Sequence, residues 1–236
     1  MLSRLIQWMS WLGRFELTTL VLIAAVAGGV WVFVEVADEV LEGNTRALDE
    51  AIILAMRERD DPADPRGPQW LEEVGRDVTA LGGVAVLTLL TLASAGYLLL
   101  LQKRHAAVLL LITVVGGQAL GLSLKHFFHR PRPDLVSHES LVYTASFPSG
   151  HSMMAAVTYL TLAAMLMRFQ ARRRLKAYVL VLATLLTLLV GISRVYMGVH
   201  WPTDVLAGWS LGGTWAVLCW LIALWLQKRG QVEQEA

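Results

Sequence analysis

Residues 106–133 read AAVLLLITVVGGQALGLSLKHFFHRPRP, an apolar run that ends in a cluster of basic residues. The apolar part, about Ala106–Phe128, has the length of roughly 20 residues that a helix needs to cross the hydrocarbon core of a bilayer. Lys125, Arg132 and Pro133 lie at its end. The stretch therefore predicts a membrane-spanning helix that delivers cations to one membrane surface.

The same length criterion predicts six membrane-spanning helices. They cover about Leu17–Val36, Ala80–Leu101, Ala106–Phe128, Ser152–Met167, Ala177–Tyr196 and Val205–Leu226. Of the 236 residues 56% are hydrophobic, and the mean hydropathy is +0.53, which is too apolar for an ordinary soluble domain. The net charge of +1, with basic residues spread among short connections, argues against a nucleic-acid partner. We expect a single all-α integral membrane domain over residues 1–236, a six-transmembrane-helix bundle of unknown oligomeric state with the lipid bilayer around it.

The charges of the connections predict the orientation of the bundle. Basic residues gather on one side, at Arg4, Arg14, Gln102–Arg104, Arg168–Lys176 and Lys228–Arg229. The opposite side carries most of the acidic residues, between Asp38 and Asp77. Because cytoplasmic connections carry the excess of Lys and Arg, both termini should be cytoplasmic in a bacterial-type cytoplasmic (inner) membrane. Three polar clusters would then share the extracytoplasmic (periplasmic) face: one follows the third span, one precedes the fourth, and one lies between the fifth and the sixth.

The connection from about Ala37 to Thr79 is an extracytoplasmic insertion that is too long for a simple turn. Asn44 or Thr45 is placed to cap a helix that runs to about Arg59. Its apolar stripe would comprise Leu48, Ile52, Ala55 and Met56. A second helical stretch from Trp70 should run into the second span. Two interpretations stay open: an amphipathic helical cover on the membrane surface near the polar clusters, or a solvated connector.

Three cations border the same predicted membrane interface. Arg194 ends the fifth predicted span, where an arginine is costly unless it is paired or used. Lys125 and Arg132 end the third. A phosphate monoester would satisfy all three, because arginine offers two-pronged hydrogen bonds and lysine a point charge. Snorkelling to lipid headgroups explains one such residue, but explains three converging cations poorly.

The sequence Pro148-Ser149-Gly150-His151 stands immediately before an apolar helical run. Backbone N–H groups at a helix start lack partners and favour anions. Gly150 permits close approach of the backbone to a ligand, and Ser149 adds a hydroxyl donor. The alternative for this string is a plain helix cap.

His200 and Asp204 stand four residues apart, and Pro202 and Thr203 between them mark a helix start. Asp204 can then reach back to a ring nitrogen of His200, which fixes the tautomer and raises the basicity of the other nitrogen. The alternative is an interfacial histidine beside an acid that the helix dipole favours. We expect Trp201 to anchor the chain at the membrane interface.

The remaining histidines and the single cysteine are expected to have structural roles. His126 and His129 are three apart, but no carboxylate or cysteine completes a metal-ligand set, so we expect no metal and no cofactor. His105 and His138 lie in connections. Because Cys219 is the single cysteine, an intrachain disulfide is excluded. Its position inside an apolar run predicts a small buried side chain.

Together these clusters resemble the three-part signature of the type 2 phosphatidic acid phosphatase superfamily, K-x6-RP, PSGH and SR-x5-H-x3-D. Every signature position is filled, by Lys125, Arg132 and Pro133, by Pro148, Ser149, Gly150 and His151, and by Ser193, Arg194, His200 and Asp204. These motifs span about 80 residues, and the six-span layout extends the resemblance to most of the chain. The insertion at about 37–79 is outside it.

The resemblance implies a metal-independent lipid phosphate phosphatase that works through a phosphohistidine. His200 would attack phosphorus while Asp204 orients it, and His151 would protonate the leaving oxygen and then activate water. The phosphate oxygens would be held by Lys125, Arg132, Ser149, Gly150 and Arg194.

A site at the outer headgroup level suits a membrane lipid phosphate whose tail stays in the bilayer. An isoprenoid diphosphate such as undecaprenyl diphosphate, phosphatidylglycerol phosphate, phosphatidate and a lipid A phosphate all fit the signature. Two rival functions stay open. A lipid phosphotransferase would pass the phosphoryl group to an acceptor other than water. A non-hydrolytic lipid-phosphate transporter should lack the nucleophile or the proton donor, whereas His200 and His151 are both present.

Overall fold

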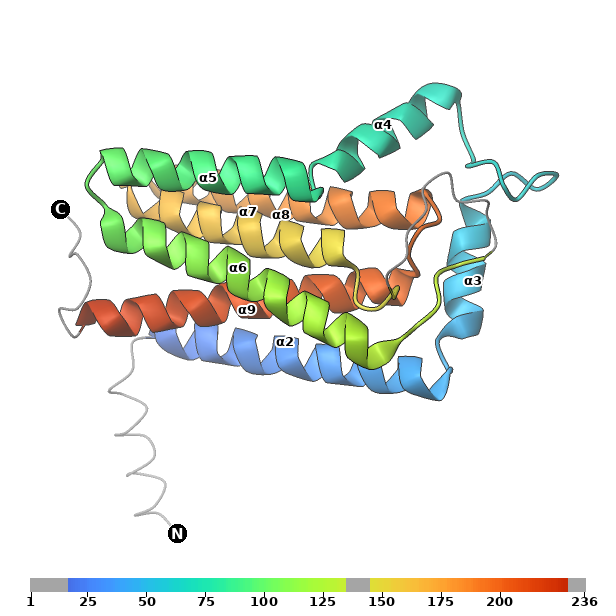
Figure 1. Cartoon of the computed structure of the whole chain (residues 1–236), viewed down its shortest axis with the longest axis horizontal. Helices are drawn as coiled ribbons and strands as arrows, with labels where there is room; N and C mark the ends of the chain where they lie inside the picture. The colour runs from blue at the N-terminus through green and yellow to red at the C-terminus, as the bar shows by residue number, and fades with distance from the viewer. Residues whose placement is uncertain (1–16, 135–144, 229–236) are drawn as a thin grey trace, which may run out of the picture.

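The computed structural model describes residues 17–134 and 145–228. Arg4, Arg14, His138 and Arg229, which entered the sequence interpretation, lie outside this part of the chain. The described residues form helices α2 (Leu17–Glu42), α3 (Arg46–Ala55), α4 (Gln69–Ala80), α5 (Val84–Leu100), α6 (Arg104–Phe128), α7 (Gly150–Arg168), α8 (Arg173–Tyr196) and α9 (Pro202–Lys228). Figure 1 shows α2 and α5 to α9 as one bundle, with α3 running across its end.

The helices confirm an all-α membrane fold. Five of those described, α2, α6, α7, α8 and α9, are long and apolar enough to cross a bilayer. α4 and α5 meet the same test together, as a pair bent by 46°, which gives up to six spans. The helical stretch expected from Trp70 is α4, but it does not run straight into the second span: it ends at Ala80, and the span itself is α5. Gly82 occupies the break because a Cβ there would run into the Val190 side chain and lie 3.3 Å from the His151 Cβ.

α7 is the central helix of the bundle. In an 18-residue apolar stretch of α7, 61% of the residues are buried inside the protein. The corresponding share is 6% for α2, which lies at the periphery. α7 packs against α9 at a very short distance, since a Cβ on Gly208 would lie 2.7 Å from the Ser149 carbonyl oxygen. A Cβ on Gly212 would meet the Met153 carbonyl oxygen. Small residues of this kind let helix backbones touch inside a membrane.

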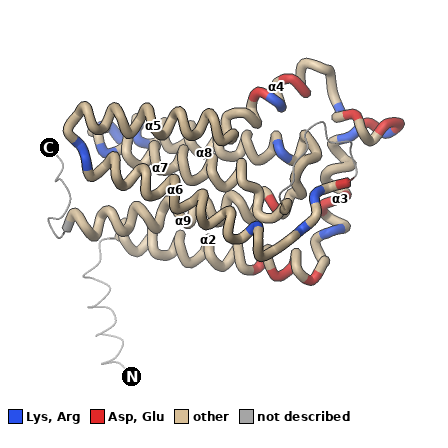
Figure 2. The backbone as a smooth tube through the Cα atoms, in the orientation of Figure 1, with Lys and Arg blue, Asp and Glu red and all other residues tan. Residues whose placement is uncertain are grey.

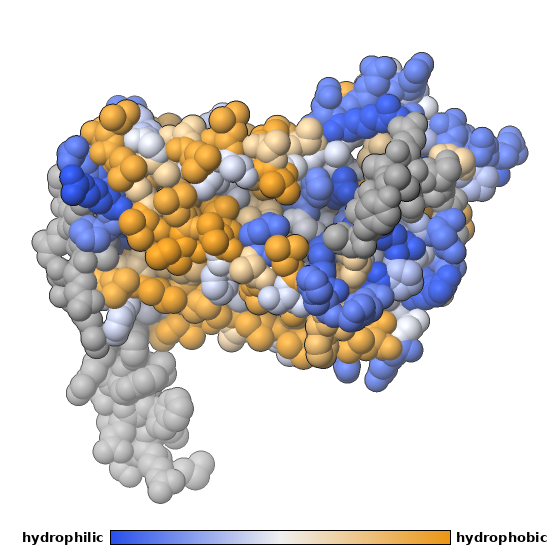
Figure 3. Space-filling view, in the orientation of Figure 1, coloured by the Kyte–Doolittle hydropathy of each residue, from blue (hydrophilic) through white to orange (hydrophobic). Residues whose placement is uncertain are grey.

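The surface divides into an apolar band and two polar ends. Figure 3 shows hydrophobic side chains along the length of the bundle and hydrophilic ones around α3, α4 and the opposite turns. Lys and Arg without acidic residues mark the end that carries the α5–α6 and α7–α8 connections in the described chain, while Asp and Glu gather with α3 and α4 (Figure 2). This distribution is typical of a multi-pass membrane protein.

Four expectations about residues 37–79 need correction, the last of them in part. α2 continues to Glu42, six residues past the predicted end at Val36, and α3 stops at Ala55 instead of Arg59. Thr45 precedes α3, but its side chain makes no capping hydrogen bond. The predicted stripe is correct for Ile52 and Met56, which pack against the buried cluster of Ile53, but Leu48 is 62% exposed and Ala55 is exposed, whereas Asp49 and Ile53 are fully buried.

α3 is packed against the end of the bundle. Ile53 is fully buried in a cluster with Val195, Trp201 and Val205. This packing makes α3 part of the folded body, so a solvated connector does not describe it.

Candidate active site

All three polar clusters meet at the end of the bundle that α3 covers. Lys125 comes from the last turn of α6, Ser149 to His151 from the start of α7, and Arg194 from the last turn of α8. His200 lies in the short turn between α8 and α9. Gly198 starts that turn with a φ of +67°, a conformation that glycine adopts without strain.

His200 and Asp204 form the hydrogen bond that their spacing predicts. α9 begins at Pro202, and His200 Nδ1 lies 3.3 Å from Asp204 Oδ2. The same carboxylate oxygen accepts a hydrogen bond from the Trp201 backbone N–H at 3.0 Å and another from the Ser146 hydroxyl. The second ring nitrogen, Nε2, lies 3.2 Å from Arg132 Nη1. Since a guanidinium only donates, Nε2 is the unprotonated nitrogen in this arrangement.

Burial keeps the His200 ring neutral. The side chain is almost fully buried, and this burial lowers the pKa of His200 to about 3, although the Asp204 carboxylate opposes the shift. The nearby Arg132 and Arg194 charges lower the pKa further. His200 is therefore uncharged at neutral pH and presents a lone pair, as a nucleophile must.

Arg130 holds the other oxygen of Asp204, and sequence reasoning missed it. Arg130 Nη1 lies 2.6 Å from Asp204 Oδ1, and Nη2 lies 2.7 Å from Asp49 Oδ2. Both carboxylates are fully buried. The guanidinium also lies over the Trp201 ring, 5.6 Å from its centroid.

Trp201 is consequently a buried residue, 4% exposed, and the expectation of an interfacial anchor was wrong. Its indole Nε1 donates to the Pro131 carbonyl oxygen at 3.0 Å. The ring thereby supports the segment that carries Arg130.

All three predicted phosphate-binding cations contact neutral groups. Lys125 Nζ donates to the Ala145 carbonyl oxygen at 3.0 Å, and Arg194 Nη1 donates to the Thr79 hydroxyl at 3.1 Å. Arg132 Nη1 donates to the Val199 carbonyl oxygen at 2.7 Å besides approaching His200. The buried Nε of Arg194 finds no acceptor among residues 17–134 and 145–228. A buried donor of this kind calls for an acceptor.

The residues at the start of α7 also contribute to the site. Ser149 is the N-cap, and its fully buried Oγ accepts hydrogen bonds from the backbone N–H and the hydroxyl of Ser152. Gly150 lies beside Lys125, because a Cβ at this position would be 3.9 Å from Nζ. His151 follows in the first turn of α7 and interacts electrostatically with Arg194 and His200.

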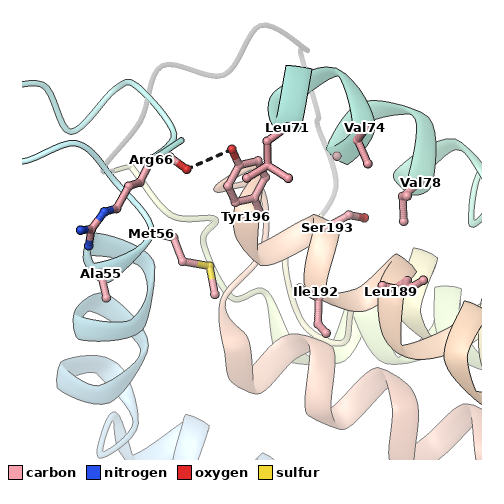
Figure 4. Close-up of a pocket in the computed structure, with 11 residues that line it drawn as sticks. Ala55, Met56, Arg66, Leu71, Val74, Val78, Leu189, Ile192, Ser193 and Tyr196 are labelled. Carbon is pink, nitrogen blue, oxygen red and sulfur yellow. Dashed lines mark hydrogen bonds between the residues drawn. The ribbon is translucent and has the colours of Figure 1, made fainter. Parts of the chain in front are cut away.

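An apolar cavity of about 380 Å³ lies between α4 and α8 (Figure 4). It is lined by Ala55, Met56, Arg66, Leu71, Val74, Gly75, Val78, Leu189, Ile192, Ser193 and Tyr196. Val78 and Ser193 immediately precede Thr79 and Arg194, the pair joined by a hydrogen bond. The cavity is therefore lined by the chain neighbours of this pair, while Thr79 and Arg194 themselves are not among its lining residues.

Other titratable residues stand apart from the site. His126 Nδ1 lies 2.8 Å from the Leu122 carbonyl oxygen, one helical turn back, and His129 ends α6 in a left-handed conformation. The described residues include no cluster of three His, Cys, Asp or Glu side chains with metal-ligand spacing. Cys219 is a buried residue of α9, as expected.

A sequence profile described as the PAP2 superfamily matches residues 106–228, slightly more than half of the chain and the part that carries the three clusters. The chain belongs to the PAP2 superfamily. It is accordingly a membrane lipid phosphatase of the PAP2 type, and α2 to α5 lie outside the matched region.

Individual relatives point to the same class of membrane phosphatase. Phosphatidylglycerophosphatase B of Bacillus subtilis is 40% identical over 149 residues, which cover 61% of this chain and 70% of the relative. Lipid A 1-phosphatase of Rhizobium etli is 28% identical over 193 residues, or 71% of this chain and 78% of the relative.

A solved structure has the same PAP2 fold. The crystal structure of a transmembrane PAP2 type phosphatidylglycerolphosphate phosphatase from Bacillus subtilis superposes with a TM-score of 0.75 at 30% identity. The match covers 85% of this chain and 96% of that one.

Proposed function

We propose that this PAP2 protein hydrolyses the phosphate monoester of a membrane lipid through a phosphohistidine formed on His200, without a metal ion. The observation that carries the proposal is the His200–Asp204 pair. Asp204 accepts from Nδ1, and the lone pair of a neutral, buried imidazole remains on Nε2. An attacking imidazole requires an orienting carboxylate on one ring nitrogen and an unprotonated second ring nitrogen.

The cations beside His200 support the binding of a phosphate. Lys125, Arg132 and Arg194 approach from three different segments, and Arg194 Nε lacks an acceptor within the described chain. A phosphate oxygen would provide that acceptor and offset the positive charges. The Gly150 N–H and the Ser149 hydroxyl, at the start of α7, add donors for equatorial oxygens in the transition state.

His151 is the proton donor and acceptor in the proposed mechanism. His200 Nε2 forms a bond to phosphorus as the P–O bond to the lipid breaks, and His151 gives its proton to the departing oxygen. The resulting neutral His151 then takes a proton from water, whose oxygen bonds to phosphorus as the P–N bond breaks. The products are the dephosphorylated lipid, inorganic phosphate and the restored imidazole of His200.

The substrate we propose is a glycerophospholipid monoester of the phosphatidylglycerol phosphate kind. Support comes from the apolar cavity between α4 and α8, which suits a hydrocarbon chain, and from the names of the Bacillus subtilis relatives. Undecaprenyl diphosphate, phosphatidate and lipid A phosphates are the competing substrates. Undecaprenyl-diphosphatase of Sulfolobus acidocaldarius matches less of the chain, at 32% identity over 116 residues.

The site is proposed to face the extracytoplasmic side of a cytoplasmic membrane. The end away from the site carries Lys103, Arg104 and the basic α7–α8 connection, which favours the cytoplasm. In a Cys219→Ala background, Asp60→Cys should react with an impermeant maleimide in intact cells, and Lys103→Cys should react only after permeabilisation. The reverse pattern would invert the topology.

The mechanism can be tested by trapping the phosphoenzyme. The purified protein should release phosphate from a panel of lipid phosphates in the presence of EDTA, and loss of activity that a divalent ion restores would contradict a metal-free reaction. His200→Ala should form no acid-labile, base-stable phosphopeptide. His151→Ala should still be phosphorylated by an activated aryl phosphate and should accumulate the intermediate, because water lacks its base.

The position of the trapped phosphate decides the assignment of roles. A phosphate found on His151, or one found in the His200→Ala protein, would reverse it. Transfer of the phosphate to an added alcohol in preference to water would identify a phosphotransferase.

A further inference from the structure

We propose that Asp49, on α3, is a positioning residue for the reaction: it holds the Arg130 guanidinium against Asp204 and so fixes the carboxylate that orients His200. α3 belongs to the insertion outside the PAP2-matched region, so the inference assigns a part of the active-site support to a segment that the family signature leaves out. It rests on the proposed function, since it concerns the attack by His200.

Asp49 is a buried carboxylate with a full set of partners. None of its surface is exposed, although it lies on a helix whose next residue, Glu50, is at the surface in an ion pair with Arg46. Asp49 Oδ1 accepts from the Thr203 backbone N–H at 3.0 Å. Oδ2 accepts from the Thr203 hydroxyl at 2.6 Å and from Arg130 Nη2 at 2.7 Å. Burying a carboxylate is costly unless it is paired in this way.

Arg130 uses the two arms of its guanidinium on two different helices. Nη2 contacts α3, through Asp49 at 2.7 Å and the Thr45 hydroxyl at 3.3 Å. Nη1 contacts α9, through Asp204 at 2.6 Å and the Thr203 hydroxyl at 2.8 Å. The guanidinium is planar and rigid, so anchoring one arm fixes the direction of the other.

The Arg130 contact determines which way the Asp204 carboxylate faces. With Oδ1 held by Arg130, Oδ2 is left for His200 Nδ1, the Ser146 hydroxyl and the Trp201 backbone N–H. If Asp49 no longer held Arg130, the guanidinium would keep a single carboxylate partner and could rotate with it. Hydrogen-bonded partners behind a functional histidine typically change activity by about ten- to a hundredfold when they are altered.

Asp49→Asn separates this role from the support of α9. The Asn oxygen can still accept from the Thr203 N–H, so the start of α9 keeps its partner. The Asn amide group, however, carries no negative charge and offers donors to the Arg130 donors. The change therefore weakens the hold on Arg130 with little change in shape.

The test is a single-turnover measurement of phosphohistidine formation with an activated aryl phosphate. Asp49→Asn should lower the rate constant by about ten- to a hundredfold while KM stays within about twofold, because Lys125 and Arg194 are untouched. Glu50→Gln is the matched control, since it removes the adjacent carboxylate of the same helix from an exposed ion pair. It should leave both constants unchanged.

A double mutant distinguishes positioning from a loss of folding. If Asp49 acts through Arg130, Asp49→Asn should add little to the defect of Arg130→Gln, whereas independent effects would multiply. Arg130→Lys keeps the charge but loses the two-armed contact, and it should slow the reaction by a similar factor. This variant decides the question if Asp49→Asn elutes as an aggregate or loses its cooperative thermal transition.

Three results would have different meanings. A wild-type rate for Asp49→Asn or Arg130→Lys, or multiplicative effects in the double mutant, would overturn the positioning role and leave the proposed function intact. A phosphopeptide in His200→Ala, measured in the same series, would instead remove the proposed function. A rise in KM with an unchanged rate constant would move Asp49 to substrate binding and overturn the inference.

Discussion

The active site has a carboxylate side and a cation side, and the two are built in opposite ways. On the carboxylate side, Asp204 and Asp49 are fully buried, and both are paired with Arg130. On the cation side, Lys125 and Arg194 donate to a carbonyl oxygen and a hydroxyl group, neither of which carries a charge.

The difference separates orientation from binding. A paired carboxylate is held in one place and has its charge offset, so it can fix the direction of His200. The charge of a buried cation with neutral partners is not offset by an opposite charge, so the cation can attract an anionic ligand. Disruption of the first side should therefore lower rate constants and stability together, whereas disruption of the second should lower activity without destabilising the fold.

The largest effect is expected on the carboxylate side, from Asp204→Asn. Loss of the charge and of the correct tautomer of His200 should slow phosphoenzyme formation by about 10⁴-fold. Thermal stability should also fall, because Arg130 then has one carboxylate partner in place of two. Rapid-quench kinetics and thermal unfolding in detergent measure the two quantities. Asp134→Asn, an exposed acid at the same end, is the control, and a rate within tenfold of wild type for Asp204→Asn would contradict the orienting role.

Arg194→Gln tests the cation side. Removal of one donor from the developing phosphate charge should lower kcat/KM by about 10²- to 10³-fold. The unfolding temperature should stay the same or rise, because a buried cation whose partner in the described residues is a neutral hydroxyl is replaced by a neutral group. Arg172→Gln removes an exposed cation from the opposite end and should change neither quantity. A large fall in stability for Arg194→Gln would contradict the expectation that the cation side contributes to activity and not to the stability of the fold.

These two sides also differ in how well they can be read from the sequence. The cations and His200 are visible because the spacing of the three clusters is fixed by helix ends, where polar residues interrupt apolar runs. Arg130 lies between Lys125 and Arg132 and has no signal of its own, since its role depends on a partner 81 residues away.

The burial of Asp49 could not be predicted from the sequence, because aspartate is a charged residue. Hydrophobic periodicity does not detect a buried aspartate, and the predicted apolar stripe accordingly contained Leu48 and left Asp49 out. In the structure Asp49 is buried in an ion pair with Arg130, and Ile53 is buried beside the partly buried Ile52 and Met56. The bundle itself could be predicted, because six apolar runs of bilayer length leave few alternatives, but the break between α4 and α5 depends on the packing of Gly82 against α7 and α8.

A smaller effect is expected from the apolar cavity between α4 and α8. Val74→Trp would fill part of the space between α4 and α8, and the displaced hydrocarbon chain would lose the burial of about two methylene groups, at ~0.8 kcal/mol each. KM for a long-chain lipid phosphate should rise by about tenfold, while an aryl phosphate should be hydrolysed as by the wild type. Val86→Trp, at a half-exposed position of α5 away from the cavity, is the matched control. An equal loss for both substrates would exclude a hydrocarbon chain from this cavity.

The smallest effect concerns acid stability on the carboxylate side. The pKa of His200 falls from 6.5 to about 3 in the folded protein, so the unfolded chain binds one more proton between these pH values. Stability from this residue is present above pH 6.5 and is lost progressively as the pH falls toward 3. His200→Gln should therefore show a smaller drop in unfolding temperature between pH 7 and 4 than wild type, and the exposed His126→Gln should not. Equal drops in the His200→Gln and wild-type proteins would show that burial does not hold the imidazole neutral.

The close backbone contact between α7 and α9 fixes the distance between the two helices at the site. Gly208 and Gly212 bring α9 against carbonyl oxygens of α7, and the two helices carry Asp204 and His151. Carbonyl oxygens cannot rotate out of the way as side chains can, so we expect the separation of His151 and Asp204, the proposed proton donor and the proposed orienting carboxylate, to be insensitive to repacking of the lipid-facing surface. Attempts to redirect this enzyme to other phosphates should leave both glycines alone and vary α4, where the walls of the cavity are side chains.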